Sequence, residues 1–120
     1  MDAEALKELF APFGPVTVRR MFGGAGIYAD GLCFAIAPRS GEVYIKSDAE
    51  TQVAFAAAGS APFVYEMQGK PKSMAFWRLV AEAYDDEDAL KRWAQLGLGA
   101  ARRAAAAKAT RAKAPRGKPR

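Results

Sequence analysis

The sequence predicts an α+β fold in which helices pack on an antiparallel sheet. Short alternating apolar runs, separated by tight turns, occupy much of residues 16–80 and indicate strands that pair with their neighbours along the chain. Helical patterns stand before, between and after these runs, in the order helix, about four strands, helix, two strands, helix. This grouping favours helices packed on one sheet over a doubly wound fold.

A first helix is predicted after Asp2, because an aspartate side chain is suited to capping a helix start. The apolar residues that follow have the spacing of one helical face, and Gly14 and Pro15 end the pattern. We expect this face to pack on the sheet together with Leu90 and Trp93 of the last helix. The residues of the face are Leu6, Leu9, Phe10 and Phe13.

Four strands are predicted next, within residues 16–22, 26–29, 32–37 and 42–46. Asp30-Gly31 joins the second and third of them and has the composition of a type I′ turn, in which both central residues need a positive φ.

The glycines of the RRMFGGAGIYADG stretch are predicted to serve the backbone. Gly23-Gly24 is expected to form the turn between the first two strands, and Gly26 to mark a bulge or a close backbone approach. A phosphate-binding fingerprint would need a helix after Gly26, where this sequence has a strand, and no Gly-Lys-Ser/Thr is present. No cofactor is therefore expected at this site.

Residues 47–50 have a capping-box pattern, which predicts a short second helix over residues 48–58 that Gly59 closes. A second hairpin is expected within residues 63–80, around the loop Gln68-Gly69-Lys70-Pro71. The acidic residues 85–88 then begin a third helix, where negative charge complements the helix dipole. They lack the spacing of a calcium loop, so capping is a better interpretation than metal binding.

The composition excludes several kinds of catalysis. The chain has no histidine, so a His general base, a Ser/His/Asp triad and the common zinc ligand sets are absent. No nucleophile stands beside a base, and we expect a protein that is not an enzyme and holds no metal. The single Cys33 lies in an apolar run, which favours a buried thiol in a reducing compartment. Without a signal peptide or a membrane-spanning run, a soluble cytoplasmic protein is expected.

Charge divides the chain into a body and a tail. Residues 1–100 hold 10 Lys+Arg and 13 Asp+Glu, whereas residues 101–120 hold 8 Lys+Arg and no acid. We expect an α+β domain over 1–100 and a basic Ala/Lys/Arg/Pro tail over 101–120, which extends the last helix and is disordered from Ala114 onward.

The tail is a candidate DNA contact without sequence preference, and its alternative role is only to keep the protein soluble. Its closing PRGKPR resembles the AT-hook core, with Lys118 where that motif has its second arginine. The candidate DNA-binding residues are Arg102, Arg103, Lys108, Arg111, Lys113, Arg116, Lys118 and Arg120.

Three further cations are candidates for contacts with a partner protein. Arg19-Arg20 interrupts the strand alternation, so at least one of the two side chains reaches solvent, and the other is able to pair with a carboxylate such as Asp30. Lys70 lies in the predicted loop of the second hairpin. A solvated or ion-paired surface is the simpler interpretation of all three.

These stretches carry a resemblance to a known family. The stretches are, in order, RRMFGGAGIYADG, LCFAIA, GSAPFVY, GKPKSMAFW and a helix with an acidic start and a central Trp-Ala. This series resembles the N-terminal domain of the TfoX/Sxy regulators of bacterial competence. The resemblance covers roughly residues 1–100 and implies an α+β fold with an antiparallel sheet, no catalysis and a role in transcription regulation beside another regulatory protein. It also implies a single-domain member, without the helical C-terminal domain of the competence regulators.

Two functions remain open at this point. The first is a non-enzymatic regulatory protein whose basic tail binds DNA weakly and without specificity. The second is a protein-interaction or adaptor module, able to form a homodimer, whose tail only adds solubility.

Overall fold

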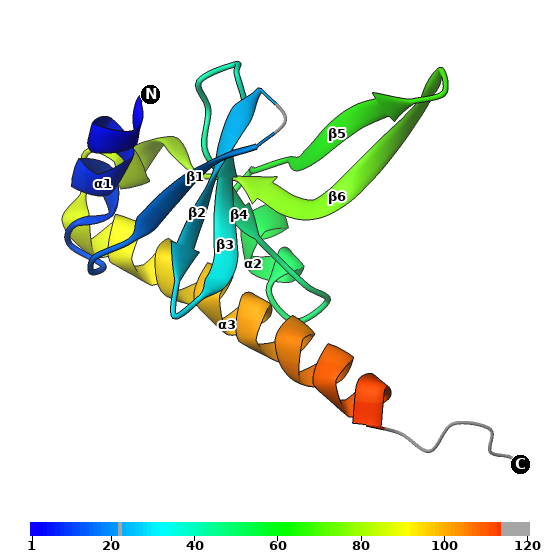
Figure 1. The fold of residues 1–120 in the computed structure, drawn as a ribbon. Helices are drawn as coiled ribbons and strands as arrows, with labels where there is room; N and C mark the ends of the chain where they lie inside the picture. The colour runs from blue at the N-terminus through cyan, green and yellow to red at the C-terminus, as the bar shows by residue number, and fades with distance from the viewer. Residues whose placement is uncertain (22, 114–120) are drawn as a thin grey trace, which may run out of the picture.

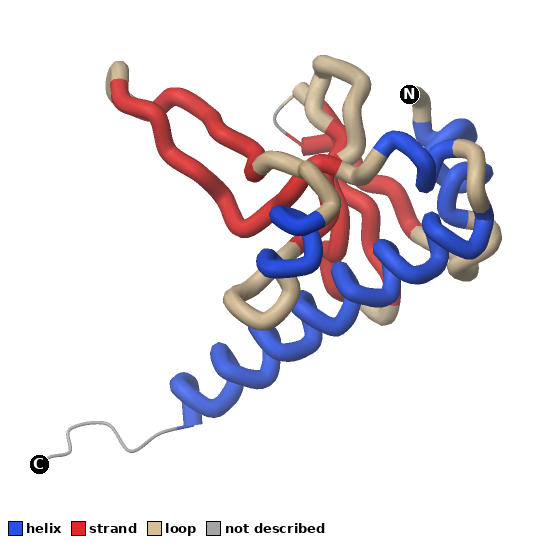
Figure 2. The backbone as a smooth tube through the Cα atoms, turned by 180° about the vertical axis from the view of Figure 1, so that it is seen from behind, coloured by secondary structure: helices blue, strands red, loops and turns tan. Residues whose placement is uncertain are grey.

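The computed structural model describes residues 1–21 and 23–113, and the side chains of these residues except 65–67, 71–74 and 111–113. Within this part of the chain, an antiparallel sheet of six strands has the order β1-β2-β3-β4-β6-β5. The helices lie on one face of the sheet, as Figure 1 and the reverse view in Figure 2 show together. The predicted α+β class and the predicted order of elements are confirmed.

The register of the sheet places side chains in rows across the strands, because residues directly opposite one another share a face. One row faces the helices and consists of Val18, Ile27, Ala35, Ile45 and Trp77. The strands are β1 (Thr17–Met21), β2 (Gly24–Ala29), β3 (Leu32–Ala37), β4 (Tyr44–Lys46), β5 (Pro62–Met67) and β6 (Lys70–Arg78).

The first and last helices begin as their capping residues predict. The Ala5 N–H donates to the Asp2 carboxylate at 2.8 Å at the start of α1 (Ala3–Phe10). The Ala89 N–H donates to the Asp86 carboxylate at 3.0 Å at the start of α3 (Glu87–Lys113). The acids of residues 85–88 therefore act at a helix start, and a short 3-10 turn, η1 (Ala81–Tyr84), which the sequence did not indicate, precedes them.

The second helix begins later than the sequence predicts. Helix α2 is Gln52–Ala57, and the capping pair is Asp48 with Thr51 instead of the expected pair at residues 47 and 50. The Thr51 N–H donates to Asp48 Oδ1 while the Asp48 N–H donates to Thr51 Oγ1, both at 3.0 Å, and this reciprocal pair takes up the turn before the helix. Gly59, with φ +82°, ends α2 as predicted.

Both predicted hairpins form, and the Asp30-Gly31 turn has the backbone that was predicted for it. Asp30 (φ 53°) and Gly31 (φ 75°) join β2 to β3, and Gln68 (φ 55°) and Gly69 (φ 78°) join β5 to β6. Both pairs have the positive φ values of a type I′ turn. The second turn is shorter than predicted, because Lys70 already belongs to β6.

The glycines near residue 24 serve close packing as well as turning. Gly23 (φ +77°) lies in the β1–β2 turn, but Gly24 is the first residue of β2, so the predicted Gly23-Gly24 turn is one residue too long. A Cβ on Gly24 would come within 2.6 Å of the Ala37 carbonyl oxygen, so this position needs glycine for close backbone approach. The register shift in this sheet region follows Ile27 and does not fall at Gly26.

The core lies between the sheet and the helices. Phe34 is left without a partner on β2 by the register shift, and its side chain is fully buried against Phe10, with the two ring centroids 5.3 Å apart. Trp93 of α3 contacts Phe55 of α2, with the ring centroids 4.7 Å apart. Leu6, Phe10, Leu90 and Trp93 are buried and Leu9 is partly buried, so the expected packing of the first and last helices on one face is confirmed.

Candidate nucleic-acid interface

The last helix continues beyond the body, as the tail sequence predicts. Ala101 of α3 is 4% exposed, but nearly all of the described residues beyond it are exposed, and Figure 1 shows the end of the helix projecting past the sheet. An alanine-rich segment propagates a helix that the core has already nucleated, because only the first turn carries the cost of nucleation. We call residues 102–113 the basic extension; they span about 18 Å at 1.5 Å per residue.

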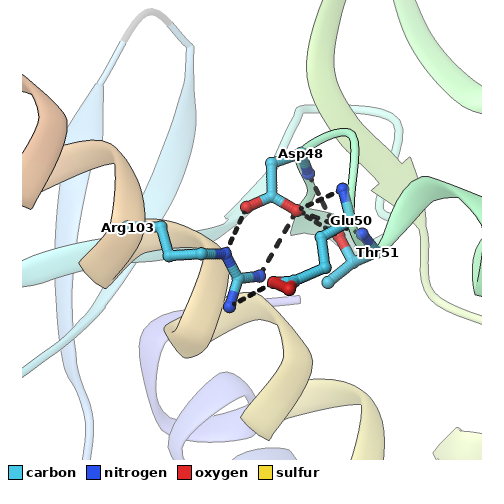
Figure 3. A network of polar contacts seen from close by, with 4 residues as sticks. All are labelled: Asp48, Glu50, Thr51 and Arg103. Atoms are coloured by element: carbon cyan, nitrogen blue, oxygen red, sulfur yellow. Dashed lines mark hydrogen bonds and ion pairs between the residues drawn. The ribbon is translucent and has the colours of Figure 1, made fainter.

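The first two cations of the basic extension bind acids of the body. Arg102 forms an ion pair with Asp30 in the β2–β3 turn. Arg103 donates from Nε to Asp48 Oδ2 at 2.7 Å, and its Nη1 lies 2.8 Å from a carboxylate oxygen of Glu50 (Figure 3). Asp30, which the sequence offered as one example of a carboxylate partner for Arg19 or Arg20, pairs with α3 instead, because the turn faces that helix.

The contact with Arg103 also alters the acidity of its partner. The hydrogen bond from the Arg103 guanidinium holds the pKa of the Asp48 carboxyl below its usual value, and the backbone N–H of Thr51 contributes in the same direction. Asp48 thus joins α2 and α3: it caps the turn before one helix and accepts from a side chain of the other (Figure 3).

Of the remaining cations of the tail, Lys108 has a described side chain. Lys108 is exposed, and no acid among the described side chains forms an ion pair with it. Arg111 and Lys113 belong to the last turns of α3. Arg116, Lys118 and Arg120 lie outside the described residues, as does the stretch from Ala114 for which disorder is expected. The eight candidate residues are thus divided between two that contact the body and six beyond them.

The three candidates for partner contact do not form one surface. Arg19 and Arg20 are both exposed but alternate between the two faces of β1. Lys70 is exposed beside the β5–β6 turn, and β1 and β5 are the opposite edges of the sheet. A single partner site made of these three cations is therefore not present in the described geometry.

The register identifies a surface that the sequence analysis missed. We call the sheet face away from the helices the open face; one row across it consists of Arg19, Gly26, Ile36, Tyr44 and Arg78. Its other described residues include Tyr28, Cys33, Lys46 and Phe76. The alternation in Tyr44-Ile45-Lys46 and Phe76-Trp77-Arg78 is a sequence signal for this face. The strand order that brings these residues together could not be predicted from the sequence.

Two cations lie over aromatic rings on the open face. The Arg19 guanidinium is 5.3 Å from the centre of the Tyr28 ring, and the Lys46 ammonium is 5.0 Å from that of Phe76. The Tyr28 ring has space to lie across Gly26, where an added Cβ would come within 3.0 Å of its Cε1 atom. Gly26 therefore provides room for a side chain, whereas a bulge or a backbone approach was expected there.

Burial also affects the thiol on this face. Cys33 is half-buried, whereas the apolar run predicted a buried thiol, and desolvation raises the pKa of its thiol.

The region of the glycines adjoins an open cleft of about 680 Å³. Its walls include Gly23 and Gly24, the Asp2 cap of α1, and the arginines Arg20 and Arg39. Among the residues that the structure describes, α1 is the one helix that begins at this cleft, and Asp2 already accepts from its backbone. The expectation that no nucleotide binds here stays a prediction.

The described residues contain neither a membrane-spanning helix nor a metal-binding cluster. No helix among them is both long and apolar enough to cross a membrane. No group of three or more Cys, Asp or Glu side chains among them is arranged to hold a metal ion.

Together, these features define a small α+β domain with helices on one sheet face and a basic helical extension at its end. The sequence matches the TfoX N-terminal domain family over residues 8–101 of 120, and the chain therefore belongs to that family. No curated protein matches it. The matched segment ends just before Arg102, so the basic extension lies outside the family domain.

Proposed function

We propose that this chain is a non-enzymatic regulatory protein of the competence-regulator type, whose body contacts another protein and whose tail binds DNA without sequence preference. Membership of the TfoX N-terminal domain family supports the regulatory role. The observation that carries the DNA contact is the basic extension, a helix that projects from the body and presents cations with no acid among them.

The ion pairs of the basic extension refine which residues contact DNA. Arg102 and Arg103 are held by acids of the body, so binding a phosphate through either one means giving up an existing partner. The DNA contact is therefore assigned first to the six cations beyond them. These are Lys108, Arg111, Lys113, Arg116, Lys118 and Arg120.

Counterion release predicts the salt dependence of this contact. If all six cations meet phosphates of duplex DNA, the slope of log K against log salt is about −5. The two paired arginines would make the slope steeper only if they exchanged their carboxylate partners for phosphates. Mixed-sequence and A·T-rich duplexes should bind almost equally, because Lys118 lacks the flat guanidinium used in the minor groove.

The test is a titration of labelled duplex DNA at several salt concentrations. The full chain is compared with a variant in which the six cations are replaced by glutamine, a good helix former that preserves the length and the ion pairs. We expect the slope above for the wild type and loss of binding for the variant. As a control, K7Q with K91Q removes two exposed charges from α1 and α3 within the body and should leave binding nearly unchanged.

A slope near zero would contradict the DNA contact, as would a wild type that fails to shift duplex DNA at about 50 mM salt. The tail would then serve solubility alone. The adaptor function would be the better proposal in that case, and one observation favours it: the β5–β6 hairpin extends away from the helices (Figure 2), with Val64 of β5 54% exposed. Sedimentation of the wild type would then report whether two copies associate.

A further inference from the structure

The proposed function assigns no role to the residues of the open face. No helix within residues 1–21 and 23–113 covers it, since α1, α2 and α3 all lie on the other face of the sheet (Figures 1 and 2). One row across it begins with Arg19 and ends with Arg78, and it crosses five strands, which are separated by four strand spacings. At about 4.8 Å per strand, the row is about 19 Å wide.

The charge of the open face is positive. Its described cations are Arg19, Lys46 and Arg78. Arg78 forms an ion pair at 3.5 Å with Glu42, which precedes β4, and no ion pair with Arg19 or Lys46 is found among the described side chains. A ligand that covers this surface therefore has to bring negative charge.

This charge argues against two occupants from the chain itself. Residues 114–120 carry three cations and no acid, so the end of the tail would be repelled. A second copy placed face to face would oppose the same cations to one another. A polyanion from outside the chain is the complementary partner.

The aromatic rings decide which polyanion suits the surface. Tyr28 is half-buried and lies in the same part of the face as Arg19, whose guanidinium is over the ring. Phe76 is 8% exposed, and the Lys46 ammonium lies over it in the same way. If a phosphate draws either cation away from the aromatic ring beneath it, the face of that ring becomes free to stack on a flat group of the ligand. Rings interleaved with cations are the arrangement on which unpaired bases stack.

We propose that the open face binds single-stranded nucleic acid, with phosphates at Arg19 and Lys46 and bases stacked on Tyr28 and Phe76. Duplex DNA suits this surface less well, because its bases are already stacked and present no free face. An acidic peptide would satisfy the charges but would leave the rings without a stacking partner. This site is separate from the basic extension and does not depend on the proposed DNA contact there.

The experiment measures binding of a labelled single strand of about 12 nucleotides, a length typical of such sites. It uses the full chain and also the six-glutamine variant, so that failure of the tail proposal and failure of this one are distinguishable. We expect Y28L, which keeps apolar bulk but removes the ring, to weaken single-strand binding about 5- to 150-fold. Binding of duplex DNA by the full chain should be unchanged.

A second variant tests the phosphate contacts. R19Q with K46Q should reduce the salt slope for the single strand by about 1.4, whereas K7Q with K91Q removes the same charge from the helices and should not. Thermal melting of each variant checks that the domain remains folded. The proposal is overturned if folded Y28L binds the single strand as tightly as the wild type does. It is equally overturned if an oligoglutamate of matched charge competes as well as the single strand, because recognition would then be of charge alone.

Discussion

Gly97 and Gly99 lie two residues apart in α3, and their surroundings differ. A Cβ on Gly97 would come within 2.5 Å of Ile45 Cγ2 and 2.9 Å of the Phe34 carbonyl oxygen, so α3 approaches the sheet as closely as a glycine allows. A Cβ on Gly99 would meet only the end of the Arg103 side chain, at 3.6 Å. The first glycine therefore serves packing, whereas the second only lowers helix propensity.

This contrast predicts opposite effects of one substitution. G99A should raise the free energy of unfolding by about 1 kcal/mol, because alanine is the better helix former. G97A should lower it by about 1 to 3 kcal/mol despite the same gain in propensity, since the added methyl group overpacks the helix–sheet contact. Urea unfolding followed by tryptophan fluorescence measures both. Equal stabilisation by the two substitutions would show that α3 does not lie this close to β3 and β4.

Cys33 offers a second prediction at the scale of one residue. Burial raises the pKa of its thiol, so less thiolate is present at pH 8 than in a freely exposed cysteine. The folded protein should therefore react more slowly with an aromatic disulfide reagent than the same chain does in concentrated urea. Equal rates in the two conditions would contradict the half-buried position of the side chain.

At the scale of elements, Asp48 connects α2 with the start of the basic extension. Its carboxylate accepts from the Thr51 backbone and from Arg103, and the hydrogen bond from Arg103 is the largest cause of its lowered pKa. Two helices that are far apart along the chain are thereby tied at one acid.

The lowered pKa of Asp48 predicts how its contribution varies with pH. A carboxyl whose pKa is lower in the folded than in the unfolded state stabilises fully above the unfolded value, about 3.9, and loses this effect as the pH falls through the folded value. D48N should therefore be less stable than the wild type at pH 7, and the difference in urea midpoint should shrink as the pH is lowered below about 4. A difference that is constant with pH would contradict the ion pair.

At the scale of the whole molecule, stability comes from one core on one side of the sheet. All three α-helices contribute fully buried or nearly buried residues to it, and Trp93 lies where α2 and α3 meet. The Nε1 group of Trp93 is buried without a hydrogen-bond partner among the described residues, so the ring contributes through its apolar surface.

Removal of this ring should weaken the whole domain. W93A is expected to lower the free energy of unfolding by about 3 to 5 kcal/mol, a large part of the 5 to 15 kcal/mol typical of a domain. Circular dichroism should show loss of both helix and strand in a single transition at a much lower temperature. A variant that melts within a few degrees of the wild type would place Trp93 at the surface and assign it to a partner contact.

Local features could be predicted because their causes lie within a few residues. The cap at Asp2 and the turn at Asp30-Gly31 depend on side-chain chemistry and φ values that neighbouring residues hardly alter. The start of α2 was predicted wrongly because two capping patterns overlap there, one at residues 47 and 50 and one at residues 48 and 51. The second pattern forms, and in the structure Asp48 also contacts Arg103, which is distant in the sequence. The register shift that turns Phe34 into the core was likewise not visible, since it requires the partner strand.

The sequence by itself determined the α+β class, the order of the elements and the charge of the tail, because periodicity, turn residues and composition act locally. Only the tertiary structure decided how those charges are used. Arg102 and Arg103 meet acids 72 and 55 residues earlier in the chain, and Arg19 and Arg78 end one row across five strands. Contacts of this kind depend on which strands become neighbours and on where a helix crosses the sheet, and the packing of the whole core sets both.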